Sequence, residues 1–222
     1  MSQRLQTVKD LRQAGVIAVV RTSTPEEAVK VVSALAAGGV NAVEVTFTVP
    51  DAAEAIAEVA RLGVADLLGE VILGAGTVVT AEQAHAAIDA GATYLVSPHL
   101  SMEVVEVARE RDVAMLPGAF TPGEVFAAHA AGADIVKVFP AARLGPSYLK
   151  DLRGPYPQIP LMPTGGVTVE NLDEWLTAGA VAVGVGGELV PKPAVAAGDF
   201  AEIKHRAEVF VAALAAARQE KH

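Results

Sequence analysis

The feature that most constrains this chain is a repeat in which short apolar runs alternate with alanine-rich segments of helical character. The eight apolar runs are Val16–Val20, Ala42–Phe47, Val71–Ala75, Tyr94–Ser97, Val113–Leu116, Ile135–Phe139, Leu161–Pro163 and Val181–Val185. Most of them are apolar at every position and not only at alternate positions, which is typical of parallel strands covered by helices. The repeat therefore predicts an α/β protein with eight parallel strands.

The segments between the runs begin with helix start signals. Thr24-Pro25-Glu26-Glu27 combines an N-cap residue, a proline at the first helical position and acidic residues in the first turn. Similar signals stand at Pro50-Asp51, Thr80-Ala81-Glu82, Ser101-Met102-Glu103, Thr121-Pro122-Gly123-Glu124 and Thr168-Val169-Glu170. We also expect an extra N-terminal helix over about 2–13 and a last helix over about 199–217.

An Ala-Gly pair recurs before every second run and indicates how the units are arranged. In Ala37-Gly38, Ala90-Gly91, Ala131-Gly132 and Ala178-Gly179 a helix ends with glycine and a strand follows. Eight units with this period predict a single (β/α)8 TIM barrel over about 15–190, within one domain that spans residues 1–222. The alternative is an open, doubly wound sheet, which is disfavoured because no Gly-x-Gly-x-x-Gly loop follows the first run.

Composition and charge exclude several classes of protein. A hydrophobic content of 52% with 19% charged residues excludes a disordered chain. No charge-free apolar run reaches the ~18 residues of a membrane span, and the first residues lack the apolar core of a signal peptide. The net charge of −9 argues against nucleic-acid binding, and the absence of cysteine excludes disulfides and thiolate metal sites. We therefore expect a cytoplasmic protein that binds neither membranes nor nucleic acids.

Lys137 is a charged residue inside the otherwise apolar run Ile135–Phe139. Lysine is among the residues least often fully buried without a partner. Burial disfavours the charged form of an amine, and a neutral amine in an apolar site is a nucleophile towards ketones. Lys137 is therefore either a Schiff-base lysine or a strand-end lysine whose head reaches solvent.

The glycine repeat places a second charge opposite this lysine. Five residues after Gly39, Gly91, Gly132 and Gly179 stand, in this order, Glu44, Val96, Lys137 and Gly184. In a (β/α)8 barrel, side chains from alternate strands share one interior layer. We expect Glu44 and Lys137 to face one another across the barrel and to project into a pocket. The alternative is a buried ion pair without chemistry, which rarely stabilises a protein because desolvation can exceed the Coulomb gain.

The ends of other runs supply further candidates. Arg21, directly after the first run, is able to clamp a carboxylate, although a surface arginine is an equal reading. Gly74-Ala75-Gly76-Thr77 offers a hydroxyl group and an approachable backbone. Pro163-Thr164-Gly165-Gly166 and Gly184-Val185-Gly186-Gly187 follow the seventh and eighth runs, where this fold frequently holds phosphate on backbone N–H groups.

The histidines do not predict a metal site. His85, His99, His129, His205 and His222 show no paired ligand spacing. His99 follows the fourth run, where it either lines the site or is a solvated loop residue.

Several of these segments together resemble a known family. The segments, in order, are Val43-Glu44-Val45-Thr46, Gly74-Ala75-Gly76-Thr77, Val96-Ser97-Pro98, Leu116-Pro117-Gly118, Lys137-Val138-Phe139-Pro140-Ala141 and Pro163-Thr164-Gly165-Gly166. They look like the class I aldolases of 2-keto-3-deoxy-6-phosphogluconate (KDPG) and 4-hydroxy-2-oxoglutarate (KHG). The resemblance implies a homotrimeric barrel without metal or cofactor that cleaves a 2-keto acid, KDPG, to pyruvate and glyceraldehyde 3-phosphate in the Entner-Doudoroff pathway.

The resemblance also implies a role for each matching residue. Lys137 matches the Schiff-base lysine and Glu44 the acid/base glutamate. The other matches are Arg21 and Thr77 for the pyruvate carboxylate, Pro98 and Phe139 for the pocket wall, and Thr164, Gly165, Gly166, Gly186 and Gly187 for the phosphate.

Three positions depart from the pattern of many members: Thr48 replaces an arginine, Gly187 a serine and His99 a glycine. These departures concern the part of the substrate that does not become pyruvate, so the substrate itself stays open. The alternatives to KDPG are the phosphogalactonate epimer and KHG. Two other classes remain open as well: a sugar-phosphate epimerase or isomerase on a similar barrel, and a non-catalytic barrel that serves as a scaffold.

Overall fold

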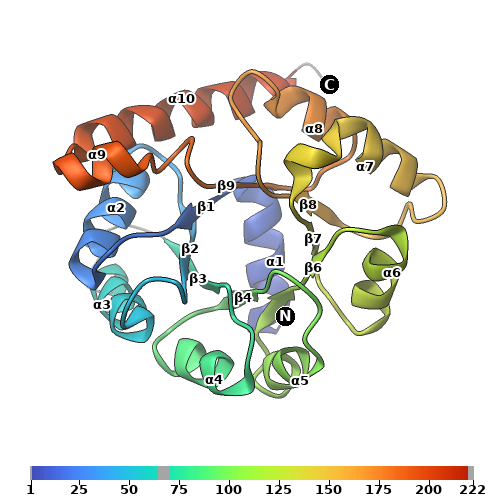
Figure 1. Ribbon diagram of the computed structural model, residues 1–222, viewed down its shortest axis with the longest axis horizontal. Helices are drawn as coiled ribbons and strands as arrows, with labels where there is room; N and C mark the ends of the chain where they lie inside the picture. The colour runs from blue at the N-terminus through green and yellow to red at the C-terminus, as the bar shows by residue number, and fades with distance from the viewer. Residues whose placement is uncertain (1, 65–70, 220–222) are drawn as a thin grey trace.

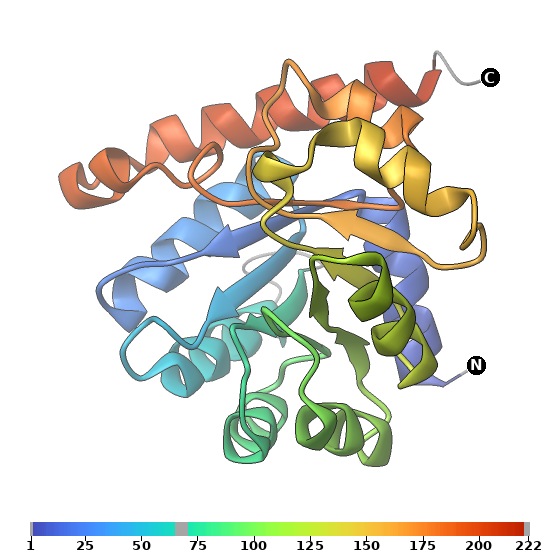
Figure 2. The same ribbon diagram turned by 45° about the vertical axis from the view of Figure 1, so that its right-hand side comes forward.

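The structure is a computed structural model that describes residues 2–64 and 71–219 of the 222-residue chain. Its strands lie at the centre with helices around them, and one helix, α1, lies across one end of the strands (Figures 1 and 2). The strands are β1 (Val16–Val20), β2 (Ala42–Thr46), β3 (Ile72–Gly76), β4 (Tyr94–Val96), β5 (Ala114–Leu116), β6 (Gly118–Ala119), β7 (Val136–Val138), β8 (Leu161–Pro163) and β9 (Val183–Val185). The helices are α1 (Gln3–Ala14), α2 (Pro25–Ala37), α3 (Ala52–Val64), α4 (Ala81–Asp89), α5 (Met102–Glu110), α6 (Pro122–Ala130), α7 (Gly145–Arg153), α8 (Leu172–Thr177), α9 (Lys192–Ala197) and α10 (Phe200–Gln219), with a 3-10 turn η1 at Ala141–Arg143.

The strands form a curled, all-parallel arrangement in two sheets. Six strands pair in the order β5-β4-β3-β2-β1-β9, and three pair in the order β6-β7-β8. An isolated parallel bridge between Thr164 and Gly184 connects the end of β8 to β9. The expected α/β fold with parallel strands is confirmed, whereas the closed (β/α)8 barrel stays a prediction, because the strands pair in two separate sheets.

The predicted fifth strand is divided at Pro117, which separates β5 from β6. Before the proline, the Leu116 carbonyl accepts from the backbone N–H of Ser97, beside β4. After it, the Pro117 carbonyl accepts from the backbone N–H of Lys137 on β7 at 2.9 Å. Because proline has no N–H to donate, the chain changes its neighbouring strand at this residue.

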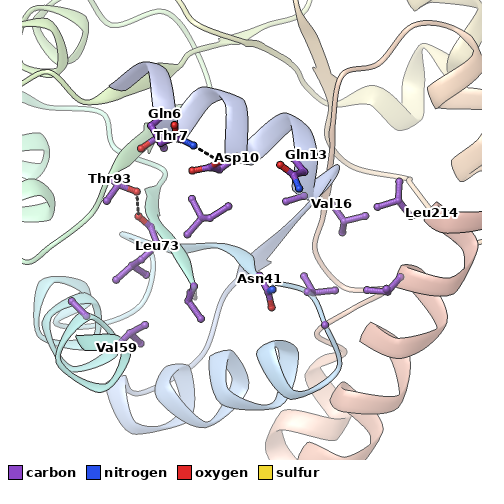
Figure 3. Close-up of a pocket in the computed structure, with 18 of the residues that line it drawn as sticks. Gln6, Thr7, Asp10, Gln13, Val16, Asn41, Val59, Leu73, Thr93 and Leu214 are labelled. Atoms are coloured by element: carbon purple, nitrogen blue, oxygen red, sulfur yellow. Dashed lines mark hydrogen bonds between the residues drawn. The ribbon is translucent and has the colours of Figure 1, made fainter. Parts of the chain in front are cut away.

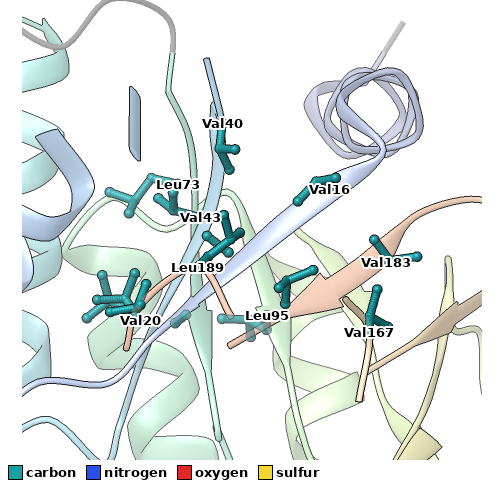
Figure 4. Packing of buried hydrophobic residues seen from close by; sticks show 14 of the residues in the cluster. Val16, Val20, Val40, Val43, Leu73, Leu95, Val167, Val183 and Leu189 are labelled. Atoms are coloured by element: carbon teal, nitrogen blue, oxygen red, sulfur yellow. The ribbon is translucent and has the colours of Figure 1, made fainter. Parts of the chain in front are cut away.

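Successive residues of each strand enter two different packing layers. On β1, Val16, Ala18 and Val20 join the outer layer, in which strands pack against helices (Figure 4). Ile17 joins a smaller inner cluster with Tyr94 and other residues of the strands, which Leu11 of α1 covers from one end. Because both faces are buried, the runs are apolar at every position, as the sequence predicted.

The helix boundaries follow most of the predicted start signals. Thr24, Thr80 and Thr121 each accept a hydrogen bond from the backbone N–H three residues on, which caps α2, α4 and α6. The start expected at Thr168 is wrong, since α8 begins at Leu172. The side chain of Asn171 accepts from the Thr168 N–H and donates to a backbone carbonyl, which holds the preceding segment as a loop. Helix α9 was not expected.

The two terminal helices agree with the predictions to within two residues. They also contact one another, because the Arg218 side chain donates to the backbone carbonyls of Arg12 and Gln13. The predicted domain includes residues 1, 65–70 and 220–222, which lie outside the described residues, as does His222. In the part of the chain that the structure describes, no helix is long and apolar enough to cross a membrane.

Candidate active site

Glu44 and Lys137 face one another in the interior, from strands that lie on opposite sides. Glu44 is the central residue of β2, and Lys137 is the central residue of β7. The Lys137 Nζ atom lies 3.7 Å from Glu44 Oε1, and the side chains are only 6% and 2% exposed. The predicted proximity of the two charges is confirmed, and Lys137 does not extend its head into solvent.

Glycines on β3 provide the space that the carboxyl group occupies. A Cβ atom added at Gly76 would lie 2.9 Å from both Cδ and Oε1 of Glu44. A Cβ atom at Gly74 would overlap the phenol ring of Tyr94, the fully buried first residue of β4. Two successive inward positions of β3 therefore lack side chains, and groups from the neighbouring strands fill the space above them.

Both carboxylate oxygens of Glu44 are buried and have no hydrogen-bond partner among the described residues, and the 3.7 Å separation from Lys137 exceeds hydrogen-bond length. Thr164 Oγ1, at the end of β8, is also buried without a partner. Buried polar atoms are nearly always paired, so these exceptions need an explanation. A substrate that carries hydroxyl and carbonyl groups offers the missing partners.

Arg21 and Thr77, which the family resemblance assigned to one carboxylate, are brought together at the ends of β1 and β3. The Arg21 guanidinium donates to the Thr77 hydroxyl at 3.5 Å and to the Thr48 hydroxyl at 3.4 Å. Thr48 and Thr46 hydroxyl oxygens are 2.6 Å apart, and Thr46 donates to the Val20 carbonyl. Thr48 thus connects Arg21 to β1 and β2.

Thr77 has a backbone φ of 57°, in the left-handed region that residues with a side chain rarely adopt. Strained backbone of this kind concentrates at functional sites. The conformation is a second reason, besides the contact with Arg21, to treat Thr77 as part of the site.

Phe139 lies beside the lysine, and Pro98 contacts the strand that pairs with it. The ring centroid of Phe139 is 5.3 Å from Lys137 Nζ. Pro98 contacts Gly118, where an added Cβ atom would overlap the proline carbonyl, and Gly118 is paired in register with Lys137. His99 is exposed, and only its backbone carbonyl is bound, by the Ser97 hydroxyl.

The two glycine loops leave neighbouring strands. The bridge between Thr164 and Gly184 holds β8 beside β9, so the loops that follow begin next to each other. Gly165 and Gly166 have φ values of 90° and 76°, which require glycine. Gly186 is half-buried and Gly187 exposed, and a Cβ atom at Gly187 would meet nothing within 4 Å.

One cavity lies at the opposite end of the strands. Its volume is about 1090 Å³, and its lining includes α1 and the residues at which β1, β2 and β3 begin (Figure 3). Gln6 donates to Asp10 there at 2.7 Å. At this amino-terminal end of a parallel α/β fold, side chains serve stability, whereas catalytic groups stand at the carboxyl ends of the strands. Chemistry therefore favours the site at Lys137 over this cavity.

A second cavity, of about 470 Å³, lies beside Arg21 at the carboxyl ends and includes Thr48 and Lys192. Glu44 and Lys137 line neither of these two cavities, and the pocket expected around them stays a prediction. Within the described residues, no three His, Cys, Asp or Glu side chains come together as metal ligands would.

Comparison with known proteins decides the family. Residues 8–206 match the family described as KDPG and KHG aldolase. The chain belongs to the KDPG and KHG aldolase family. Among its relatives, it is 40% identical to the 2-dehydro-3-deoxy-phosphogluconate aldolase of Treponema pallidum, over 87% of this chain and 90% of that one. It is 37% identical to a probable 2-dehydro-3-deoxy-6-phosphogalactonate aldolase of Rhizobium meliloti, over 89% and 90% of the two chains.

A solved structure of this family supports the comparison. The KDPG aldolase of Legionella pneumophila, with pyruvate captured as a covalent carbinolamine intermediate, superposes with a TM-score of 0.82 at 29% identity. The match covers 92% of this chain and 98% of that chain.

Reasoning from the sequence missed one buried polar group of this aldolase-family site. Tyr94 is fully buried, and burial together with the negative charge of Glu44 raises the pKa of its phenol well above the usual value. Its position two residues before Val96, in the same strand, is the signal that was available, because residues two apart on a strand point to the same side.

Proposed function

We propose that this chain is a class I aldolase that cleaves KDPG to pyruvate and glyceraldehyde 3-phosphate through a Schiff base on Lys137. The observation that carries the proposal is the buried lysine with a carboxylate 3.7 Å away. A buried ion pair of this kind stabilises a protein poorly, so a chemical role accounts for it better than a structural one.

Lys137 performs the covalent steps. Its neutral amine attacks the C2 ketone of the substrate, and the carbinolamine loses water to form an iminium. The iminium accepts the electron pair of the C3–C4 bond when this bond breaks, which yields an enamine. After protonation at C3, water attacks the iminium again, releases pyruvate and restores the free amine.

Glu44 transfers the protons. Its carboxylate removes the proton of the C4 hydroxyl as the C3–C4 bond breaks, and glyceraldehyde 3-phosphate leaves. Glu44 then returns a proton to C3 of the enamine. Its lack of any other hydrogen-bond partner leaves both oxygens available for these transfers.

The remaining residues bind and orient the substrate. Arg21 and Thr77 hold the pyruvate carboxylate, so the ketone points towards Lys137. Pro98 and Phe139 line the pocket. The phosphate is bound by Thr164 and by the backbone N–H groups of four glycines, Gly165, Gly166, Gly186 and Gly187.

Borohydride trapping tests the lysine. Reduction in the presence of pyruvate should add a pyruvate-derived mass to Lys137, identified by peptide mass spectrometry. Glu44→Gln should retain this adduct while KDPG cleavage falls by roughly 10²–10⁴, the usual contribution of a general acid/base. An adduct on Lys150 or Lys192 would contradict the assignment, and no adduct at all would favour an epimerase, an isomerase or a scaffold.

A second substrate is favoured by the glycine at position 187. A side chain there would meet nothing within 4 Å, and the glycine offers no hydroxyl to a phosphate. KHG, which carries no phosphate, is therefore a credible alternative, as is the phosphogalactonate epimer. Comparison of kcat/KM on the three compounds decides among them. Phosphorylated, charged substrates do not cross membranes unaided, which supports a cytoplasmic place in the Entner-Doudoroff pathway.

We also propose that the two sheets together form one closed (β/α)8 barrel within a single domain. Only Pro117 separates β5 from β6, and the Thr164–Gly184 bridge links β8 to β9. If β5 and β6 count as one strand, eight strands surround the interior. A crystal structure should then show backbone hydrogen bonds that continue around the entire ring.

The homotrimer expected from the resemblance also remains a proposal. Phe120 and Phe126 are 39% and 50% exposed, and Phe126 packs against Tyr156 with ring centroids 5.6 Å apart. Exposed aromatic patches of this kind often mark contacts between proteins. Light scattering should give the mass of three chains, and Phe126→Ser should reduce it to one. A wild-type mass of one chain would contradict the proposal.

A further inference from the structure

Tyr94 is the buried group whose position the proposed mechanism does not explain. Its hydroxyl is fully buried and has no hydrogen-bond partner within residues 2–64 and 71–219. A buried hydroxyl without a partner costs free energy, whereas a phenylalanine of the same shape would not. The hydroxyl is therefore expected to have a function that uses its proton.

The glycines of β3 place this hydroxyl next to the catalytic carboxylate. In the sheet, Glu44 and Tyr94 are both paired in register with Gly74, from opposite sides. The phenol end of Tyr94 lies over Gly74, and the Glu44 carboxyl group lies over Gly76. Inward positions two residues apart on a strand are about 6.6 Å apart. The phenol and the carboxyl group extend from the neighbouring strands over these two positions, and one water molecule between them would bridge a gap of up to about 5.6 Å with two hydrogen bonds of about 2.8 Å each.

Few other groups compete for the carboxylate. From β7, Lys137 faces it at 3.7 Å. The register neighbour on β1 is Val19, which carries no charge. Arg21, beyond the end of β1, is bound to Thr48 and Thr77. Among the described residues, Tyr94 therefore faces Glu44 as the second titratable group besides the lysine.

We propose that Tyr94 is a positioning residue, which donates through one buried water to the Glu44 carboxylate and holds it in its charged, proton-accepting form. The inference rests on the proposed function, because it assigns Tyr94 a task only if Glu44 acts as the base. A phenol is suited to this task, since it donates one hydrogen bond and burial keeps its proton in place. The raised pKa of the Tyr94 phenol agrees with this assignment.

The proposal is tested by following the exchange of the pyruvate methyl protons with D2O by NMR. This reaction uses pyruvate alone, so binding of the aldehyde part of the substrate does not affect it. At saturating pyruvate, Lys137 is already in the imine, so the acid side of the pH–rate profile reports the base. Tyr94→Phe should move this acid limb to higher pH by about one unit, the worth of a hydrogen bond to a charged group. Replacement of Tyr94 by 3-fluorotyrosine, a stronger donor, should move it to lower pH.

Controls separate the possible failures. Tyr156→Phe, which removes a hydroxyl from a ring that packs against Phe126 of α6, should leave the limb unchanged. Borohydride trapping should be the same in Tyr94→Phe as in the wild type, and the thermal midpoint should not be lower, which shows that Lys137 and the fold are intact. Failure of the wild type to form the adduct or to exchange would overturn the proposed function. If the wild type exchanges normally and the acid limb of the pH–rate profile stays at the same pH in Tyr94→Phe and in the 3-fluorotyrosine protein, only the role of Tyr94 would be overturned.

Discussion

Gly76→Ala is the substitution whose effect the geometry specifies most closely. The new Cβ atom would lie 2.9 Å from Cδ and Oε1 of Glu44 and 3.0 Å from Cγ2 of Thr46. Ordinary contact begins at 3.4 Å, so the carboxyl group must retreat by at least 0.5 Å. It has little room, because the side chain is 2% exposed and Lys137 stands on its other side.

Two magnitudes follow for the Gly76→Ala variant. Overpacking of a buried site costs typically 1–3 kcal/mol, so the free energy of unfolding should fall by about that amount. A displacement of a catalytic group by about 1 Å can cost on the order of 10²-fold in rate. A retreat of at least 0.5 Å should therefore lower kcat by roughly 10- to 100-fold, while substrate binding through Arg21 changes less.

The assay couples pyruvate release to NADH oxidation by lactate dehydrogenase, and urea denaturation gives the free energy of unfolding. Gly187→Ala is the matched control, because its Cβ atom would meet nothing within 4 Å, and it should not change stability. The reasoning is refuted if Gly76→Ala is folded and cleaves KDPG at the wild-type kcat, since the carboxylate position would then not limit the reaction.

Three further predictions concern other parts of the chain. Gly187→Ser should lower KM for the phosphorylated substrate several-fold and leave KM for KHG unchanged, as steady-state kinetics would show. Thr121→Ala removes the capping box of α6 and should lower the free energy of unfolding by about 1 kcal/mol in urea denaturation. Backbone hydrogen bonds from Thr121 and Phe120 hold the pKa of Glu124 below its ordinary value of 4.5. The folded state therefore favours the carboxylate, so the stability difference between wild type and Glu124→Gln should be full above about pH 4.5 and vanish as the pH falls through the lower, folded pKa; an unchanged difference at acid pH would contradict this.

The strand and helix predictions were accurate where the signal is local. Each predicted run contains a strand, because a buried parallel strand is apolar at every position. The error at Thr168 has a local cause of another kind, since Asn171 competes for the backbone groups that a helix would use. The division of β5 from β6 could not be predicted, because it depends on which strands lie beside Pro117.

Part of the candidate site was also predictable from the sequence. The glycine repeat placed Glu44 and Lys137 in one layer, since an equal offset from equivalent helix ends gives an equal height in the fold. Tyr94 was missed because an aromatic residue in an apolar run reads as ordinary core. Tyr94 differs from an ordinary core residue because its hydroxyl has no hydrogen-bond partner among the described residues. Only the tertiary structure shows this, because it shows which groups surround the hydroxyl.

By itself, the sequence determined the alternation of strands and helices, because apolar runs and helix start signals are local, and the glycine repeat determined which residue of four strands shares an inner layer. It also singled out Lys137, because an amine in an apolar strand is costly wherever that strand lies. The tertiary structure alone decided that Glu44 lies 3.7 Å from this amine and that Gly74 and Gly76 leave space for Tyr94 and the carboxylate. These contacts join residues of different strands, and packing between strands determines such distances.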